Sequence, residues 1–414
     1  MFSVGRFALF LIIAGAGIGV FWFIQQPVTI NVDSPKAVAE ATSITVETEP
    51  KIIPPTNTDI EPQKPLENPP EIVKAVYATS WSASNEKKLN YLINLIKQTE
   101  LNAIVIDIKD YSGYIVYNTD LELPKKYDAV ELRIPNLNKL IKRLHDEDIY
   151  IIGRISAFQD QRYAIARPDL ALHSSSTGAV WKDFKGLTWM DQSSREVWDY
   201  NLDIAEEIVN RGFDEINFDY IRFASDGNVK DISYPFWDEK TLKIHVMRDF
   251  FKYMRWRLPD EKISADLFGL VTVNTDGLGI GQHLEFALPY FDVIAPMVYP
   301  SHYAKTFIGF QNPAEHPYEV VKYSMDTALY RAKIYEANLL EEYGTSTPLP
   351  PIAKFRPWLQ DFDLGANYDA EKVKAQINAW DEAATNAPQY YDGWMIWNPS
   401  NVYTKEALIY YESL

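Results

Sequence analysis

From about residue 72 to its end, the chain alternates β-type runs with helical patterns, and this alternation limits the possible folds most strongly. Strands that alternate with helices indicate a parallel sheet joined by helical crossovers. The expected strands lie at residues 74–81, 103–110, 150–158, 215–223, 262–269, 293–300, 352–360 and 393–398. The expected helices lie at residues 85–99, 136–147, 193–210, 238–257, 317–337 and 369–384, with a short additional one near 283–288.

Eight strands and at least six helices predict an α/β fold of the (β/α)8 TIM-barrel type. The alternative is an open, doubly wound sheet. That alternative is disfavoured because no Gly-rich phosphate loop follows the first strand, and because polar residues recur at nearly every strand end. In a TIM barrel, the loops after the strands build the active site.

The N-terminal region differs in character from the barrel sequence. Residues 7–24 form an apolar run of about 18 residues, the length of a membrane-inserting segment, and Arg6 precedes it. We expect residues 1–25 to be an uncleaved transmembrane signal anchor, because no clear small-x-small cleavage site precedes Gln25; a cleaved signal peptide is the alternative. No Lys or Arg follows until Lys36. The positive-inside rule therefore predicts a single-pass membrane protein with its barrel outside the cytoplasm, periplasmic or extracellular.

Residues 26–70 are rich in Pro, Thr, Glu and Val. Such a segment buries too little apolar surface to offset its ordering entropy, and its prolines keep it extended. We expect a disordered linker that separates the membrane anchor from a barrel domain at residues 71–414.

The net charge of −17 disfavours a nucleic-acid partner, because a phosphate backbone would be repelled over most of the surface. The 11 Trp and 26 Tyr provide rings that can stack on sugars. The absence of cysteine excludes disulfides and thiolate metal sites. The six His show no ligand spacing such as His-x-x-x-His, so no metal or cofactor is expected. A metallohydrolase with Asp107, Asp110 and His302 at the mouth is the lesser alternative.

The segment 214–223 reads as a strand that ends in a carboxylate and an arginine. With a period of two, Asn217 and Asp219 face the barrel interior, while Ile216 and Phe218 face outward. An inward carboxylate at a strand end is typical of barrel enzymes. The competing interpretation is a structural Asp219 held by Arg222 or by backbone amides.

The same period of two brings further polar and aromatic groups to the barrel mouth. Asp266 is expected to face inward from the fifth strand, between outward Ala265 and Leu267. The expected substrate-binding residues are Asp107, Lys109, Arg154, Arg222, Tyr299, His302, Trp358, Gln360, Asp361, Trp397 and Asn398, and Arg356 is expected at the same mouth. Each alone could be a satisfied structural group, but the convergence of several favours a working site.

Several long segments resemble signature segments of a bacterial family of glycoside hydrolase-like TIM barrels, related to the α-amylase and α-galactosidase groups. They are 105–110 (VIDIKD), 178–191 (GAVWKDFKGLTWMD), 213–223, 296–303 (PMVYPSHY), 356–362 (RPWLQDF) and 393–398 (GWMIWN), within a resemblance that covers residues 72–410. In barrels of this kind a strand-four Asp is the nucleophile, so the resemblance implies that role for Asp219. Two departures, Asn217 where Gln is frequent and Ala224 where Pro is frequent, leave the candidate carboxylates in place.

Glycosidic cleavage needs a carboxylic acid to protonate the leaving oxygen and a carboxylate to attack or stabilise the anomeric centre. Asp219, beside Arg222 or Arg154, suits the second role. Asp266 is the first choice for the acid, with Asp107 and Asp361 behind it. We expect an extracytoplasmic glycoside hydrolase, anchored in the membrane, that cleaves a cell-envelope or exopolysaccharide glycan. The alternative is a barrel that binds such a glycan without cleaving it.

Overall fold

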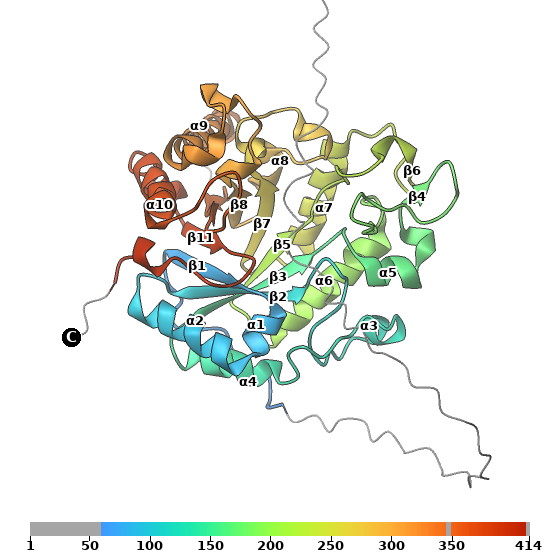
Figure 1. Ribbon diagram of the computed structural model, residues 1–414. Helices are drawn as coiled ribbons and strands as arrows, with labels where there is room; N and C mark the ends of the chain where they lie inside the picture. The colour runs from blue at the N-terminus through green and yellow to red at the C-terminus, as the bar shows by residue number, and fades with distance from the viewer. Residues whose placement is uncertain (1–58, 345–348, 411–414) are drawn as a thin grey trace, which may run out of the picture. The chain divides into compact units, whose positions relative to one another are not determined.

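The computed structural model describes residues 59–344 and 349–410, and these residues form a closed barrel of parallel strands (Figure 1). The sheet runs in the order β1–β2–β3–β5–β7–β8, continues through β9 and β10, and closes from β11 back to β1. The strands are β1 Val73–Ala78, β2 Ala103–Lys109, β3 Tyr150–Ser156, β5 Glu215–Asp219, β7 Ile263–Phe268, β8 Val293–Met297, β9 Lys354–Phe355, β10 Trp358–Gln360 and β11 Gly393–Trp397.

The barrel has eight strand positions, because β9 and β10 are two parts of one. Both pair with β8, and Pro357, which has no N–H to donate, lies between them. The nine strands of the sheet therefore reduce to eight positions. The predicted (β/α)8 barrel is confirmed, and the closure through β1 and β11 excludes the open sheet.

Helices surround the barrel (Figure 1). They are α1 Ser80–Ser84, α2 Glu86–Gln98, α3 Glu122–Lys126, α4 Leu137–His145, α5 Gln161–Ala166, α6 Arg195–Asn210, α7 Lys243–Arg257, α8 Leu284–Ala287, α9 Pro317–Tyr343 and α10 Ala370–Ala384. Two predicted starts carry side-chain caps: Asn85 accepts from the Lys88 N–H and Asp369 from the Lys372 N–H, each at 3.0 Å. Asp238 does not cap α7, because its carboxylate closes a turn onto the N–H groups of Lys240 and Thr241. A short antiparallel pair, β4 His173–Ser174 and β6 Ile232–Ser233, lies outside the barrel sheet.

The side chains on the two faces of each strand pack into two separate apolar layers. Ile216 and Phe218 belong to the large layer between sheet and helices. Val105 and Ile152 belong to a smaller cluster in which side chains from different strands fill the barrel interior. The predicted alternation of inward and outward residues is therefore confirmed along the central parts of the strands.

All of the predicted strands except 352–360 extend too far at their C-terminal ends. β5 stops at Asp219 because Tyr220 takes a left-handed conformation with φ of +53°, so residues 220–223 belong to the following loop. β1 stops at Ala78, and Thr79 caps α1 by accepting from the Ser82 N–H. These early ends place the polar groups at the tips of the strands, where loops give access from outside.

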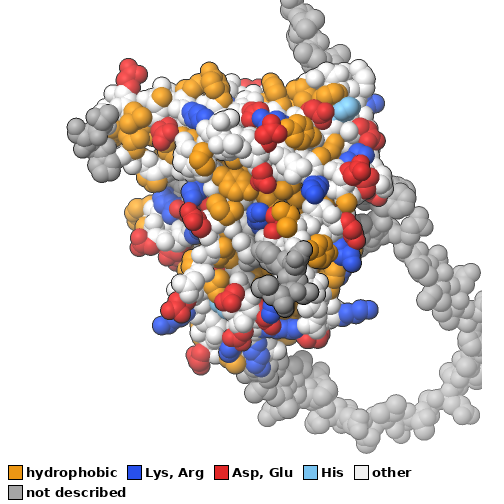
Figure 2. Space-filling model, turned by 90° about the vertical axis from the view of Figure 1, so that its left-hand side faces the viewer, with side chains coloured by type: hydrophobic (Ala, Val, Ile, Leu, Met, Phe, Trp, Pro, Cys, Tyr) orange, Lys and Arg blue, Asp and Glu red, His pale blue; other side chains and the backbone are white. Residues whose placement is uncertain are grey.

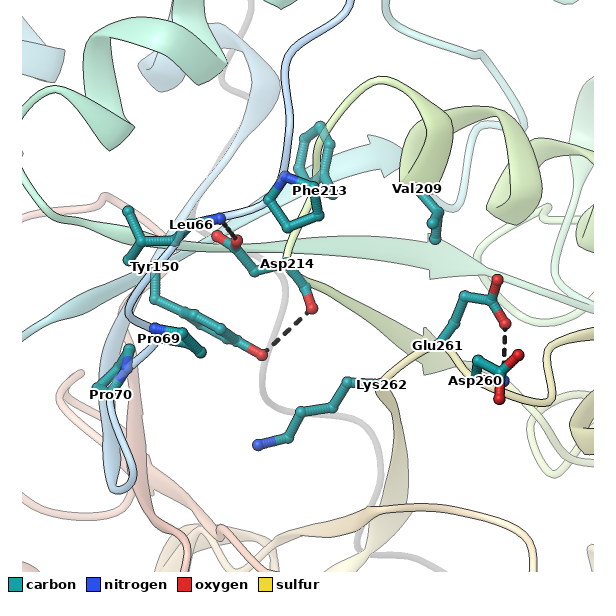
Figure 3. Close-up of a pocket in the computed structure, with 11 residues that line it drawn as sticks. Leu66, Pro69, Pro70, Tyr150, Val209, Phe213, Asp214, Asp260, Glu261 and Lys262 are labelled. Atoms are coloured by element: carbon teal, nitrogen blue, oxygen red, sulfur yellow. Dashed lines mark hydrogen bonds between the residues drawn. The ribbon is translucent and has the colours of Figure 1, made fainter.

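Residues 59–70 pack across the N-terminal end of the barrel (Figure 3). The Leu66 N–H donates to Asp214 at 2.6 Å and the Gln63 N–H donates to the Arg211 carbonyl at 3.0 Å. The carboxylate of Asp59 accepts from the N–H groups of Asn138 and Lys139 at the start of α4. Pro65, Pro69 and Pro70 line a pocket of about 410 Å³ at this end. The boundary predicted at residue 70 therefore falls inside the compact unit, which spans residues 58–414.

The predicted anchor, residues 1–25, and most of the predicted linker lie outside the described residues. Within the described part of the chain, no helix has both the length and the apolar character needed to cross a membrane.

Candidate active site

One arginine joins three carboxylates at the C-terminal ends of four neighbouring strands. Arg154 on β3 donates to Asp107 on β2, with 2.6 Å between Nη1 and Oδ1, and also donates to Asp219 on β5 through Nη2. Its Nε lies 3.8 Å from Oδ2 of Asp266 on β7. All four side chains are buried. A single guanidinium therefore contacts three acids, and its one positive charge cannot neutralise all of them if all are ionised.

Asp266 has the environment of a general acid. Its Oδ1 accepts from Trp358 Nε1 at 2.7 Å and from Asn217 Nδ2 at 2.9 Å. Burial, together with the negative charge of Asp219, raises the pKa of Asp266 to about 8, although Arg154 and these two donors act in the opposite direction. Among the described residues no group donates to Oδ2, so Oδ2 is the oxygen available to carry and release the proton.

Asp219 has the environment of a carboxylate. Its Oδ1 accepts from the Tyr220 N–H at 2.6 Å, and its Oδ2 accepts from Arg154. Both donors favour a charged acceptor. The turn at Tyr220 ends the strand directly after Asp219 and leaves this side chain at the barrel mouth.

Asp107 positions Arg154. Both of its oxygens are occupied, Oδ1 by Arg154 and Oδ2 by the hydroxyl of Tyr77. The Tyr77 ring stacks on Trp397, with 3.8 Å between ring centroids and an interplanar angle of 17°. Tyr77 was not among the site residues expected from the sequence, although the period of two along β1 puts Val73, Ala75 and Tyr77 on the same inward face.

Aromatic rings line one side of the carboxylates. Trp397 is half-buried and lies 5.2 Å from the Arg154 guanidinium. The Tyr299 ring contacts the rings of Phe362 and His302. Burial of the Tyr299 hydroxyl is the main cause that raises its pKa well above the usual range, and the negative charges of Asp266 and Asp219 add to this effect. His302 is exposed at the rim. Aromatic rings beside acids can pack against the apolar faces of a sugar ring.

Lys109 does not reach the mouth. The pairing of β2 with β3 shifts between Asp107 and Lys109, and this bulge breaks the two-residue period. The Lys109 ammonium instead lies 2.6 Å from Asp160, and neither side chain is exposed to solvent. We therefore leave Lys109 out of the proposed site.

Arg356 lies at the opposite end of the barrel from the predicted mouth. It binds Glu215, the first residue of β5, at 2.8 Å, and it also binds Asp392, which precedes β11. Burial opposes the ionisation of Glu215, but the charges of Arg356 and Lys262, together with hydrogen bonds from Arg356 and Ser264, outweigh it and lower the Glu215 pKa. Arg356 still faces the barrel interior, because Glu215 shares the inward face of β5 with Asn217 and Asp219. It misses the mouth because it precedes β10 and lies level with the start of β5, at the N-terminal end of the strands.

Arg222 packs beside the site without pairing with Asp219. Its Nη1 donates to the Phe223 carbonyl at 3.1 Å and to Ser225 Oγ at 3.0 Å. Its guanidinium lies 4.6 Å from the Phe268 ring centroid. Among the ion pairs of the described residues, Arg154 is the partner of Asp219.

Gln360, Asp361 and Asn398 connect the loops around the mouth. Gln360 accepts from the Ser301 N–H at 3.2 Å. Asp361 accepts from the N–H and hydroxyl of Thr404, at 2.8 and 2.6 Å, and Asn398 donates to the Asp361 carbonyl. Burial raises the pKa of Asp361 to about 6 against these hydrogen bonds. Because both of its oxygens are occupied, Asp361 is a weaker candidate for the acid than Asp266.

Within residues 59–344 and 349–410, no cluster of three or more His, Asp or Glu side chains could hold a metal ion. Asp110 pairs with Arg133 at 2.5 Å, whereas Asp107 pairs with Arg154. The two carboxylates therefore have separate basic partners.

A closed (β/α)8 barrel with paired acids at the C-terminal ends of its strands is the arrangement of a glycoside hydrolase-type barrel. Residues 75–403 match the sequence profile of the family described as "Putative glycosyl hydrolase domain", and the chain belongs to this family. The resemblance inferred from the sequence motifs is confirmed. No curated protein matches the chain.

Three solved structures illustrate the similarity. A hypothetical protein from Ruminiclostridium thermocellum is 36% identical over 46% of this chain and 96% of its own, with a TM-score of 0.43. The PgaB (BpsB) glycoside hydrolase domain from Bordetella bronchiseptica is 13% identical over 80% of this chain and 95% of that domain, with a TM-score of 0.55. The α-galactosidase TtGalA from Thermus thermophilus is 12% identical over 83% of this chain and 61% of that enzyme, with a TM-score of 0.46. The Bordetella domain shares the barrel fold of this chain.

Proposed function

We propose that this protein hydrolyses glycosidic bonds with Asp266 as the general acid and Asp219 as the carboxylate that attacks or stabilises the anomeric centre. The observation that carries the proposal is the different environment of the two acids. Asp219 accepts hydrogen bonds from Arg154 and from a backbone N–H, whereas Asp266, within the described part of the chain, accepts only from the neutral Trp358 and Asn217, and its pKa is raised to about 8. Two neighbouring carboxyl groups in opposite protonation states are what glycosidic cleavage requires.

The reaction begins with transfer of the Asp266 proton to the glycosidic oxygen. The bond between this oxygen and the anomeric carbon then breaks, and positive charge develops on the sugar. The carboxylate of Asp219 stabilises or attacks that centre. Water then adds its oxygen to the anomeric carbon and releases one proton, which restores the protonated form of Asp266. Trp358 and Asn217 hold the acid through Oδ1, which leaves Oδ2 to donate. Tyr299, His302 and Trp397 are proposed to contact the sugar rings.

The proposed substrate is a glycan of the cell envelope or an exopolysaccharide. The support is the apolar run at residues 7–24, which the proposal assigns as a membrane anchor with the barrel outside the cytoplasm. An enzyme held there meets polysaccharides rather than the metabolites of the cytoplasm.

The test is incubation of the full-length protein in detergent with a panel of bacterial envelope and exopolysaccharide glycans, followed by mass spectrometry of released fragments. Wild type is expected to release oligosaccharides, and Asp219→Asn is expected to release none while still binding the glycan. Asp203→Asn, which changes an acid on the surface of α6, is the matched control. Binding without release by wild type would instead favour a non-catalytic glycan-binding barrel.

A further inference from the structure

A second pocket lies on the rim between the β1 and β11 positions of the barrel. It has a volume of about 640 Å³ and is lined by Trp81, Ser82, Asn85, Lys87, Lys88, Tyr91 and Val402. α1 and the start of α2 follow β1, and Val402 lies in the loop after β11. Both segments leave the C-terminal ends of their strands, so the pocket is at the same end of the barrel as Asp219 and Asp266.

Trp81 presents a supported aromatic surface to this pocket. Its side chain is 59% exposed, which is unusual for so large an apolar group. The guanidinium of Arg133 lies 5.1 Å from the ring and is itself held by Asp110 at 2.5 Å. Arg133 does not line the pocket, so its guanidinium packs against the Trp81 ring from outside the pocket. An aromatic ring that is held in place by a neighbouring side chain and is exposed to solvent is suited to stacking on a sugar.

The pocket also carries uncompensated positive charge. The Lys88 ammonium donates to the carbonyls of Ser400 and Asn401, at 3.1 and 3.2 Å, and lies 5.7 Å from the Tyr91 ring. These partners orient the ammonium without neutralising it. Among the ion pairs of the described residues, none involves Lys87 or Lys88.

This local excess of positive charge contrasts with the negative net charge of the whole chain. Acidic residues outnumber basic ones by 57 to 40, and Figure 2 shows acidic and basic side chains interspersed over one face of the molecule. Two lysines beside two aromatic rings therefore form a site that favours a ligand with both a flat apolar face and a negative charge. Ser82 and Asn85 add a hydroxyl and an amide that can bind sugar hydroxyls.

The pocket is connected to the carboxylate site through a short series of contacts. Asn401, whose carbonyl binds Lys88, donates its side-chain amide to the Tyr77 carbonyl at 3.1 Å. Tyr77 in turn binds Asp107, which holds Arg154. These buried contacts place the pocket beside the β1–β11 side of the carboxylate site, so that a glycan chain extending from the mouth past the half-buried Trp397 is proposed to reach this rim.

We propose that the pocket of Trp81, Tyr91, Lys87 and Lys88 is a binding subsite for an acidic sugar, a uronic acid residue within the same glycan chain that occupies the barrel mouth. The inference rests on the proposed function in that it assumes a glycan at the mouth. It adds that the ligand is a polymer carrying carboxylates and that it is held at a distance from the reacting bond.

The test is calorimetric titration of the full-length protein in detergent with a matched pair of hexasaccharides, β-1,4-linked oligomannuronate and β-1,4-mannohexaose, which differ in the C6 carboxylates. Wild type is expected to bind the oligomannuronate more tightly, with an advantage that shrinks as salt is added. Trp81→Ala is expected to weaken oligomannuronate binding by about two- to tenfold. Lys88→Gln is expected to remove the preference for the acidic hexamer.

The matched controls are Trp256→Ala, which removes another exposed tryptophan, 70% exposed on α7, and Lys252→Gln on the same helix. Both are expected to bind like wild type, and thermal unfolding checks that each variant is folded. Equal binding of the two hexamers, no binding of either, or unchanged binding by Trp81→Ala and Lys88→Gln would overturn the proposal.

The outcomes also separate this inference from the proposed function. If Asp219→Asn loses hydrolysis but the rim variants bind like wild type, the subsite fails and the hydrolase stands. If no glycan is hydrolysed by wild type but the rim variants lose the acidic preference, the subsite stands and the hydrolase fails.

Discussion

At the residue scale, the site depends on Arg154, which contacts Asp107, Asp219 and Asp266 from a buried position. Removing one member of a buried ionic cluster leaves its partners uncompensated, and such changes typically cost about 3 to 5 kcal/mol. Its planar guanidinium reaches two acids with different nitrogens, which an ammonium cannot reproduce.

We predict that Arg154→Lys lowers turnover by about a hundredfold, comparable to the loss of one preorganised donor. Arg154→Ala should in addition lower the free energy of unfolding by about 3 to 5 kcal/mol. Initial rates on the glycan found in the panel and urea unfolding measure the two effects. Arg195→Lys, on the exposed side of α6, is the control for turnover and should leave it unchanged. Wild-type turnover in Arg154→Lys would contradict the assigned role.

The raised pKa of Asp266 predicts the pH dependence of the reaction. Because the acid must be protonated, kcat/KM should fall as the pH rises through about 8, where this side chain loses its proton. Asp361→Asn should retain this alkaline limb, because Asp361 is bound to Thr404. A pH–rate profile that rises steadily between pH 7 and 9 would be incompatible with Asp266 as the acid.

At the element scale, the strands were predictable because each contains a run of β-type residues with inward polar groups near its end. The period of two correctly aligned Asn217 with Asp219 and put Asp266 opposite Ala265 and Leu267. It failed where the backbone departs from regular pairing. The bulge in β2 turned Lys109 away from the mouth. Arg356 faces inward as the period of two predicts, but it lies at the opposite end of the barrel from the mouth, where it binds Glu215 at the start of β5.

The hydrogen-bond partners within the site were not predictable in the same way. Alternation shows which face a side chain takes, but contacts between strands depend on register and on the closure of the barrel. Trp358 was expected at the mouth, but its hydrogen bond to Asp266 was not expected. This hydrogen bond joins β10 to β7 across the barrel interior. Residues 59–70 have a proline-rich composition typical of linkers. They are attached by main-chain groups and by the Asp59 carboxylate, and composition does not reveal these contacts.

The attachment of residues 59–70 leads to a prediction about the free energy of unfolding. The Asp59 carboxylate accepts from two N–H groups at the start of α4, and losing such a cap typically costs about 1 kcal/mol. Asp59→Ala should therefore lower the free energy of unfolding by about 1 kcal/mol, measured by urea denaturation. Glu61→Ala, an exposed change two residues later, is the control. Equal stability of Asp59→Ala and wild type would show that the contact contributes little.

At the scale of the whole molecule, the proposed topology places an acidic barrel outside the cytoplasm on a membrane anchor. We predict that the full-length protein stays in the membrane fraction after alkaline carbonate extraction, whereas a chain lacking residues 1–25 is released. Protease added to intact spheroplasts should digest the barrel. If the protein expressed from the complete sequence is instead released with a new N-terminus near Gln25, the segment is a cleaved signal peptide.

The most direct test of the two-carboxylate assignment compares Asp219→Asn and Asp266→Asn on two substrates. One is the natural glycan, and the other is an aryl glycoside of the released sugar, whose good leaving group needs no protonation. The account predicts that Asp219→Asn loses both activities. Asp266→Asn should lose hydrolysis of the glycan but keep much of its activity on the aryl glycoside, because the acid is dispensable there. Near wild-type glycan hydrolysis by either variant would contradict the assignment.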